Sequence, residues 1–341
     1  MEYFLLILLP VIIFAVNFIF KIKNLIPNYS GEKHQRFVGA NNIPLSGGFF
    51  LILFTIFIFY NNFSLFSVFI FLIFILGLAS DINIISSPRF RFILQAALIF
   101  CFVYFSNLHI ESTRIYFLDF FLNNILLSYL FTVFCLMIVI NGTNFIDGLN
   151  GLVLGYYLMI SIIIFKFGFF IDLNISENQM IFFIILLSFL FLFNISNQLY
   201  LGDSGAYLLS FILGIFLISI YQKSQNVSPF FIILLLWYPC FENLFSIIRK
   251  FRFKRSPIYP DNNHFHQLLF YFIKIKLKYK NQFSNNLSSL IIIFYNMVIF
   301  LFSCVDITNT QYQMALISIN IIFYIFFYIR LMSFKYNLKN K

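Results

Sequence analysis

Long apolar runs, separated by short polar breaks, make up most of this 341-residue chain. A helix needs about 17–25 mainly apolar residues to cross a bilayer, and eleven runs come close to that length. Backbone N–H and C=O groups cannot stay unpaired in hydrocarbon, so each run is predicted to be helical. The pattern predicts an all-α polytopic integral membrane protein with about eleven transmembrane helices. The runs cover residues 3–20, 44–60, 64–80, 90–106, 121–140, 151–168, 180–196, 205–220, 229–246, 288–304 and 312–332.

The composition supports a membrane location. Hydrophobic residues make up 61% of the chain and charged residues 10%, whereas soluble proteins average about 45–50% and about 25%. The four cysteines lie inside apolar runs, which argues against a disulfide framework or a zinc site and favours buried packing positions. The first run has no basic flank before it and no small-residue cleavage site after it, so it is expected to be a retained helix.

The basic residues predict how the helices are oriented. If the N-terminus lies outside, 19 of the 22 lysines and arginines fall inside, and only Arg114, Lys166 and Lys223 fall outside. Positive residues accumulate on the cytoplasmic side of short loops, so we expect an outer N-terminus and an inner C-terminus. Attraction to anionic lipid headgroups then explains most of the net charge of +10, and nucleic acid is not expected as a partner. A minority of these cations could bind a phosphorylated substrate.

Acidic residues are rarer, and half of the 12 fall on the predicted inner face. An ionisable group at membrane depth is costly and therefore points to function. Any one of these residues could simply cap a helix, but three aspartates at one face favour a site. The six inner acids are Glu32, Asp81, Asp147, Asp203, Glu242 and Asp261.

Two polar breaks carry oxygen atoms suited to a divalent cation. Residues 141–151 combine amides, one carboxylate and three glycines between two apolar helices, and glycine lets backbone approach a ligand closely. Residues 202–205 form the second break, just before another helix. Mg²⁺ prefers one or two carboxylates together with substrate phosphates. Asp203, Asn144 and Asp147 would meet that need.

Basic and imidazole groups near these breaks could hold phosphates. Asp81 is followed by Arg91 in the next helix, and a carboxylate with a guanidinium group could hold a metal and a phosphate. The longest inner loop carries Arg255 and the pair His264 and His266. Guanidinium forks match phosphate oxygens, and imidazoles can donate to a pyrophosphate. Zinc is improbable there, because two histidines without cysteine do not complete its ligand set.

The order of these motifs resembles the polyprenyl-phosphate N-acetylhexosamine-1-phosphate transferase family, glycosyltransferase family 4. Any one motif is weak, but five in the family's order on one predicted face are specific. The matching elements are Lys33-His34 with Gly39, Ile43-Pro44 and Gly47-Gly48; Asp81 and Arg91; Asn141, Asn144, Asp147, Gly148 and Gly151; Gly202-Asp203-Ser204-Gly205; and Arg255-Ser256-Pro257, Pro260-Asp261, His264 and His266.

The resemblance implies a phosphoglycosyl transferase of the bacterial cytoplasmic (inner) membrane. It would transfer an N-acetylhexosamine 1-phosphate from a UDP-N-acetylsugar to undecaprenyl phosphate at the cytoplasmic face, release UMP and initiate a lipid-linked cell-envelope glycan. Mg²⁺, or Mn²⁺ in its place, would be bound by Asp203 and Asn144. The implied catalytic residues are Asp81, Asp147 and Asp203, and the implied substrate-binding residues are His34, Arg91, Asn144, Asn150, Arg255, His264 and His266.

Three residues depart from the family pattern. Ser80 replaces the first aspartate of a pair, Asn150 replaces a frequent aspartate and is a candidate for contact with uracil, and Gln267 replaces a third histidine. These features place the chain nearer to the enzymes that initiate surface polysaccharides. They also leave open that the chain is an inactive homologue. The main rival from another class is a transporter or lipid flippase, which would place its polar breaks near the bilayer midplane. Here the breaks lie at one predicted face.

The chain is expected to form one transmembrane domain over residues 1–341. Its family-like core spans residues 33–270, and residues 288–341 add two membrane helices and a cytoplasmic tail. The sequence leaves open which UDP-sugar is used, which glycan results, and whether two copies form a homodimer.

Overall fold

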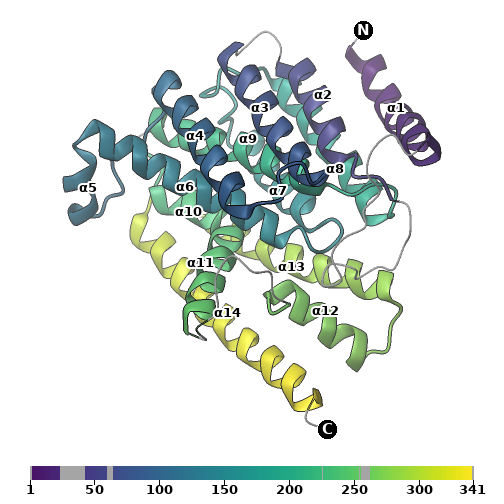
Figure 1. Cartoon of the computed structure of the whole chain (residues 1–341). Coiled ribbons are helices and arrows are strands. Elements are labelled where there is room, and N and C mark those ends of the chain that lie inside the picture. Colours follow the sequence, from purple (N-terminus) through teal and green to yellow (C-terminus); the bar gives the residue numbers. More distant parts are fainter. Residues whose placement is uncertain are drawn as a thin grey trace.

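The computed structural model describes residues 2–23, 43–59, 64–224, 226–252, 254 and 262–339. Within these ranges the chain is helical and forms no β-strand, as the apolar pattern predicts (Figure 1). The helices are α1 (Glu2–Lys23), α2 (Gly47–Phe59), α3 (Ser64–Asp81), α4 (Pro88–Ser106), α5 (Tyr116–Leu122), α6 (Ile125–Ile146), α7 (Leu152–Lys166), α8 (Glu177–Ile195), α9 (Gly202–Lys223), α10 (Pro229–Leu235), α11 (Trp237–Arg252), α12 (Phe265–Lys276), α13 (Asn281–Ser303) and α14 (Thr310–Lys339).

Every predicted apolar run coincides with a helix or a pair of helices. Among the described residues, α4, α6, α8, α9, α13 and α14 are long and apolar enough to cross a membrane. The pair α10 and α11, bent by 76° at its break, would make a seventh span, while α2, α3 and α7 are apolar but shorter. The chain is therefore a multi-pass membrane protein. The number of eleven spans and their orientation stay predictions.

Two predicted runs are broken in the structure. The run 121–140 contains the start of α6, where the Asn124 side chain accepts hydrogen bonds from the N–H groups of Leu126 (3.0 Å) and Leu127 (3.3 Å). The run 229–246 breaks between α10 and α11. Proline has no N–H and its ring crowds the carbonyl four residues earlier, so Pro239 cannot continue the helix through Leu235. That carbonyl accepts a hydrogen bond from the hydroxyl of a tyrosine in α7 instead.

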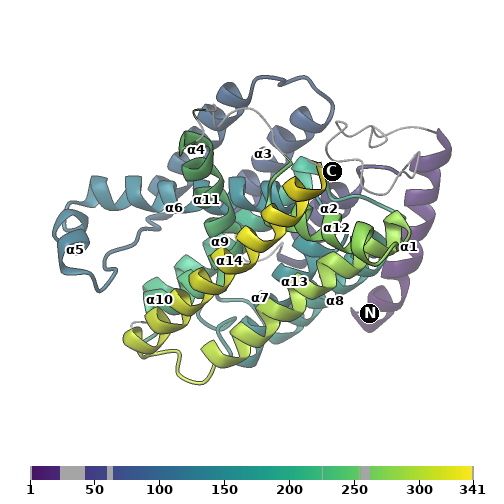
Figure 2. The same ribbon diagram turned by 90° about the horizontal axis from the view of Figure 1, so that it is seen from below.

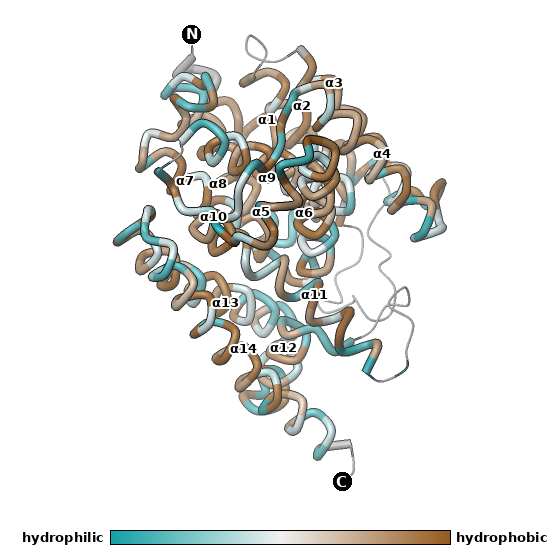
Figure 3. Tube along the Cα trace, turned by 90° about the vertical axis from the view of Figure 1, so that its left-hand side faces the viewer, coloured by the Kyte–Doolittle hydropathy of each residue, from teal (hydrophilic) through white to brown (hydrophobic). Residues whose placement is uncertain are grey.

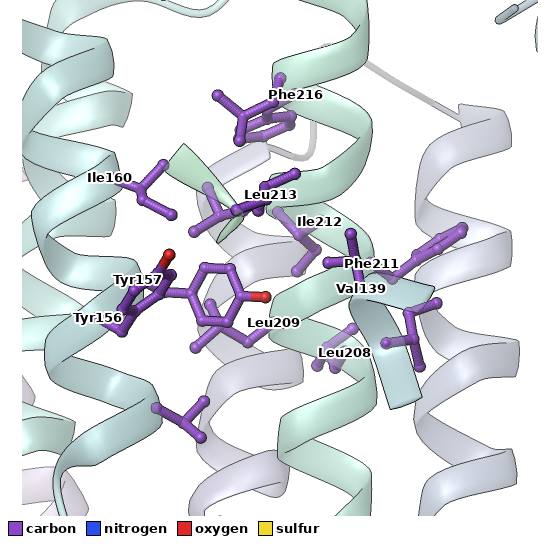
Figure 4. Packing of buried hydrophobic residues seen from close by; sticks show 14 of the residues in the cluster. Val139, Tyr156, Tyr157, Ile160, Leu208, Leu209, Phe211, Ile212, Leu213 and Phe216 are labelled. Carbon is purple, nitrogen blue, oxygen red and sulfur yellow. The ribbon is translucent and has the colours of Figure 1, made fainter. Parts of the chain in front are cut away.

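Helix α9 lies at the centre of the bundle. It packs against α2, α3 and α6, and most of its residues are buried. Figure 4 shows leucine, isoleucine and phenylalanine side chains of α9 next to Tyr156 and Tyr157 of α7. The hydroxyl of Tyr157 lies 2.6 Å from that of Thr143 in α6, so this buried polar group has a partner. Because lipid is as apolar as these side chains, close packing and such hydrogen bonds hold the helices together.

Apolar residues make up most of the helices, and hydrophilic residues interrupt them in short segments (Figure 3). At one end Arg114 joins three loops, because its guanidinium group donates to the carbonyls of Asn226 (3.4 Å), Val227 (3.2 Å) and Thr308 (3.0 Å). The breaks that follow α3 and α6 and precede α9 lie at the other end. These three breaks, which carry the predicted site residues, therefore lie at the same end of the bundle.

The four cysteines are free. Cys101 is exposed on α4, so its predicted burial is wrong. Only 22% of the apolar window of α4 is buried in the bundle, which explains why a residue of a membrane helix can lie on the surface.

Candidate active site

The Asp81 carboxylate holds the N-terminus of α9. Asp81 is the last residue of α3, and its oxygens accept hydrogen bonds from the N–H groups of Asp203 (2.8 Å) and Ser204 (3.0 Å). The first N–H groups of a helix lack partners within the helix, so a carboxylate satisfies them and interacts favourably with the helix dipole. Gly202 has a φ of +74°, and a β-carbon there would lie 2.8 Å from Asp81 Oδ2. Glycine at this position therefore allows the carboxylate to reach the helix.

Ser80 lies between Arg91 and Asp203. The Oδ2 atom of Asp203 accepts hydrogen bonds from Ser80 Oγ (2.5 Å) and Arg91 Nη1 (2.9 Å), and Arg91 also donates to the Ser80 hydroxyl. Arg91 is in the first turn of α4, which begins at Pro88. The ion pair is mostly buried, with 24% of the Arg91 side chain and 25% of the Asp203 side chain exposed. A serine thus links the two charged groups where the family pattern has an aspartate.

The end of α6 lies beside the same aspartate. Asn144 Nδ2 donates to the Tyr207 hydroxyl (3.3 Å), which donates to Asp203 Oδ2 (3.4 Å). The predicted metal ligands Asn144 and Asp203 are therefore neighbours of one tyrosine. Tyr207 is not among the predicted residues, although its position four residues after Asp203 places both on the same face of α9.

Asp147 follows the last residue of α6 and is partly buried. Burial raises the pKa of its carboxyl group well above the ordinary value, and the negative charges of Asp203 and Asp81 raise that pKa further. Three aspartates predicted from separate motifs thus share one electrostatic environment. Their joint ionisation is unfavourable unless a cation offsets the charge.

The oxygen atoms gathered here suit a hard divalent cation. Carboxylates of Asp203 and Asp147 and the amide of Asn144 are the groups that Mg²⁺ prefers. Within the described ranges, no group of three or more His, Cys, Asp or Glu side chains is placed to hold a metal ion. Binding of Mg²⁺ by Asp203 and Asn144 therefore stays a prediction, which rests on the preference of this ion for carboxylate and amide oxygens.

Asn150 lies in a cluster of buried amides. Its side chain donates to Asn197 Oδ1, and its backbone N–H donates to Asn285 Oδ1 (2.9 Å). The next N–H group, of Gly151, donates to Asn194 Oδ1. Only 6% of Asn150 is exposed. The residue therefore joins the start of α7 to α8 and α13, and its contact with uracil stays a prediction.

The two histidines lie beside the end of α6. The His264 ring centroid is 5.4 Å from that of Phe145 and 5.7 Å from that of His266. His266 is fully buried next to Gly148, where a β-carbon would lie 2.6 Å from the imidazole Nε2 atom. Neither ring nitrogen of His266 has a hydrogen-bond partner among the described residues. Burial and the neighbouring His264 lower the pKa of His266 to about 3, so its imidazole is neutral.

Gln267 stands where the family pattern has a third histidine. Its Oε1 atom accepts a hydrogen bond from the backbone N–H of His264 (3.3 Å). Glutamine at the third helical position commonly closes the first turn of a helix in this way. The departure at this position therefore has a structural role in α12.

Two predicted residues, His34 and Arg255, lie outside the described residues. Arg249, counted among the cations expected to face lipid headgroups, is only 7% exposed. Its guanidinium group donates to the carbonyl of Asn263 and to Ser246 Oγ (3.1 Å). Its role is therefore to hold the histidine loop.

Parts of the chain are similar in sequence to known proteins. The sequence model described as glycosyl transferase family 4 matches residues 63–221. The chain is 28% identical over 151 residues to a probable undecaprenyl-phosphate N-acetylglucosaminyl 1-phosphate transferase of Bacillus subtilis. It is 30% identical over 131 residues to an undecaprenyl-phosphate alpha-N-acetylglucosaminyl 1-phosphate transferase of Thermotoga maritima. It is 29% identical over 166 residues to a decaprenyl-phosphate N-acetylglucosaminephosphotransferase of Mycolicibacterium smegmatis.

The three matches cover 43%, 38% and 42% of this chain. They cover 41%, 39% and 40% of the relatives, so the chain spans about two fifths of the length of each. Residues 63–221, which carry Asp81, Asp147 and Asp203, are similar to glycosyl transferase family 4 and to parts of these three transferases.

Proposed function

We propose that the chain transfers an N-acetylhexosamine 1-phosphate from a UDP-N-acetylsugar to undecaprenyl phosphate. An oxygen of the lipid phosphate attacks the β-phosphorus of the UDP-sugar, the bond from that phosphorus to the bridging oxygen breaks, and UMP leaves. The observation that carries the proposal is the convergence of Asp203, Asp147 and Asn144 at one end of the bundle. The names of the relatives support the lipid and the sugar. The reaction would occur at the cytoplasmic face of the bacterial inner membrane and initiate a surface glycan.

The substrates bring three phosphate groups together, and their mutual repulsion must be offset. A bound Mg²⁺ or Mn²⁺ would neutralise phosphate charge and polarise the diphosphate. Asp203 and Asn144 would hold this ion, and Asp147 would orient it or the substrate. Arg91 would provide a fixed positive charge for the lipid phosphate.

Asp81 would act mainly by positioning Asp203. Both its oxygens accept hydrogen bonds from the first N–H groups of α9, which places the neighbouring aspartate at the site. A phosphate monoester has a second pKa near about 6 and is mostly ionised at neutral pH. A strong base is therefore unnecessary, and Ser80 can replace the first aspartate of the family pair.

The donor diphosphate would lie toward the histidine loop. His264 and His266 would contact it, as would His34 and Arg255. The neutral imidazole of His266 has one N–H and one lone pair without partners among the described residues, so it can both donate to and accept from a ligand.

The positions of the acids favour an enzyme over a transporter or flippase. Asp81 ends α3, Asp147 follows α6, and Asp203 is the second residue of α9. A transporter places its charged and broken segments near the midpoint of the membrane. Here all three acids lie at helix ends on one side of the bundle.

The test is turnover by the purified full chain. Undecaprenyl phosphate, Mg²⁺ and a panel of UDP-sugars are supplied, and the lipid product is identified by its mass. Asp203→Asn is expected to reduce turnover about a hundredfold or more, the scale for losing one preorganised charge-stabilising group. The matched control is Asp172→Asn, because the Asp172 carboxylate accepts from Ser224 Oγ (2.6 Å) at the opposite end of the bundle.

Each outcome identifies a different error. Normal turnover by Asp203→Asn would refute the metal assignment. Absence of lipid product with every UDP-sugar would refute the transfer reaction. Mg²⁺-dependent binding of a UDP-sugar without turnover would indicate a catalytically silent homologue.

A further inference from the structure

One face of the C-terminal helix α14 contacts the turn that carries the two histidines. Tyr324, Tyr328 and Lys335 are 4%, 6% and 9% exposed. They are spaced by four and seven residues and therefore lie on one side of the helix. Only 22% of the apolar window of α14 is buried, and this stripe belongs to the part that packs against the rest of the protein. Figures 1 and 2 both show α14 alongside α11 and α12.

The upper part of the stripe contacts a buried glutamate. Glu242 in α11 is 1% exposed and accepts hydrogen bonds from Tyr324 OH (2.6 Å), His264 Nδ1 (2.9 Å) and the Phe265 N–H (3.2 Å). Three donors stabilise an ionised carboxylate. A carboxylate has no proton to give, so the Nδ1 atom of His264 carries one. Glu242 thus fixes both the orientation and the tautomer of this imidazole.

The middle of the stripe contacts the backbone of the turn. The Tyr328 hydroxyl donates to the carbonyl of Asn263 (3.0 Å), and Arg249 donates to the same carbonyl and to the tyrosine hydroxyl. The lower part of the stripe also contacts the turn, because Lys335 Nζ donates to the Asn262 carbonyl (2.6 Å) and to the Asn263 side-chain oxygen Oδ1 (2.8 Å). A buried lysine or arginine is costly without partners, and here the partners are the atoms of one short turn.

The turn sets the distance between the histidines and the aspartate site. His264 directly follows Asn263 and packs against Phe145 of α6. His266 packs against Gly148, next to Asp147. A shift of the turn would therefore move both imidazoles relative to Asp147. The segment 63–221 that matches the family contains neither this turn nor α14.

We propose that α14 is a positioning element of the active site, which holds the turn 262–265 through Tyr324, Tyr328 and Lys335 and so places His264 and His266 for the nucleoside diphosphate of the donor. This inference rests on the proposed transferase function. Tyr324 acts through Glu242, whereas Tyr328 and Lys335 act on the backbone and side chain of the turn. None of the three would contact the reacting atoms.

The contacts can be removed without removing the packing. Tyr324 packs edge-to-face against Phe241 with ring centroids 4.9 Å apart, and Tyr328 packs in the same way against Phe245 at 4.8 Å. Tyr324→Phe and Tyr328→Phe keep these ring contacts and delete only the hydroxyl groups. Lys335→Met keeps most of the side-chain stem and deletes the ammonium group. The matched control is Tyr312→Phe, because the Tyr312 hydroxyl donates to the Phe302 carbonyl (2.8 Å) at the other end of α14.

The experiment measures the KM for the UDP-sugar and the KM for undecaprenyl phosphate separately, with the full chain. For Tyr324→Phe with Lys335→Met we expect the donor KM to rise about tenfold, the equivalent of one hydrogen bond to a charged group, and the acceptor KM to stay unchanged. Equilibrium binding of UDP, which needs no turnover, should weaken by a similar factor. Tyr312→Phe should leave all three values unchanged.

Several results would overturn the proposal. Wild-type donor KM and UDP affinity in the double variant would show that α14 does not place the histidines. An equal rise in both KM values would show general damage and not positioning. If the double variant fails to fold, Tyr328→Phe is measured alone and judged by the same donor-specific criterion. If the wild-type chain neither binds UDP nor forms lipid product, the proposed function itself fails and this inference fails with it.

Discussion

Replacing Gly202 with alanine is expected to separate Asp81 from the N-terminus of α9. The φ of +74° at Gly202 costs a residue with a β-carbon about 1–2 kcal/mol. In addition, that β-carbon would lie 2.8 Å from Asp81 Oδ2, so the carboxylate or the helix must move. The carboxylate accepts two hydrogen bonds, and a hydrogen bond to a charged group contributes about 1.5–3 kcal/mol.

Gly168→Ala is the matched control for backbone strain. Gly168 has a φ of +70°, but no atom lies within 4 Å of the position of its missing β-carbon. Both substitutions should therefore reduce stability by about 1–2 kcal/mol through the backbone alone. Only Gly202→Ala should also lose a hydrogen bond to Asp81. If that bond holds Asp203 in its catalytic position, turnover should fall about 10–150-fold, since about 1.4 kcal/mol corresponds to a factor of ten.

Two measurements separate stability from catalysis. Thermal unfolding can be followed by the fluorescence of Trp237, the single tryptophan, which is 3% exposed. Turnover is measured with saturating UDP-sugar and undecaprenyl phosphate. We expect both variants to unfold at a lower temperature than the wild type, Gly202→Ala more so because it also loses a hydrogen bond to Asp81, and turnover to fall only in Gly202→Ala. Equal turnover in the two variants would refute the conclusion that Asp81 positions Asp203.

Three further substitutions test individual contacts. Ser80→Ala removes a hydrogen-bond donor to the charged Asp203, which contributes about 1.5–3 kcal/mol, so turnover should fall about tenfold or more. An unchanged rate would contradict the conclusion that Ser80 links Arg91 to Asp203. His266→Gln should reduce acid sensitivity, because the pKa of His266 is lowered from 6.5 to about 3 in the fold. The stability of the wild-type fold is unaffected by His266 above pH 6.5, and it falls between pH 6.5 and pH 3 as the imidazole gains a proton in the unfolded chain, by about 2 kcal/mol at about pH 5. If the wild type and His266→Gln lost the same amount of stability between pH 7 and pH 5, this reasoning would be contradicted. Asn150→Ala leaves Asn197 without its partner and should cost about 1–3 kcal/mol of stability. A raised donor KM with an unchanged unfolding midpoint would instead support contact with uracil.

The positions of the long helices could be predicted because an apolar run of membrane length must be helical in a bilayer. A break inside a run is harder to predict, since it depends on one residue. Pro239 lies in an uninterrupted apolar run, yet it divides α10 from α11 because it cannot donate to Leu235. α12 was missed for the opposite reason, since its mixed polar and apolar residues do not form a run of membrane length.

The aspartates of the site could be predicted from their rarity and their position at helix ends. Their partners could not be predicted equally well, because hydrogen bonds depend on how each helix is rotated. Tyr207 and Glu242 lie inside apparently ordinary helices, and only packing shows that they face Asp203 and His264. Asn150 was predicted to contact a ligand, but the structure shows it bonded within the protein. It lies in a polar break, but amides from distant segments of the chain surround it, and no local pattern reveals those partners.

Ser80 and Arg91 are explained together by the charge around Asp203. Asp203 already lies within electrostatic reach of Asp81 and Asp147, so a fourth carboxylate at position 80 would add a further negative charge to offset. An ionised aspartate at that position could accept from Arg91 but could not donate to Asp203. The serine hydroxyl does both, and it directs Asp203 Oδ2 toward Arg91. The substitution therefore removes one charge while it keeps the orientation of Asp203 that the proposed cation site requires.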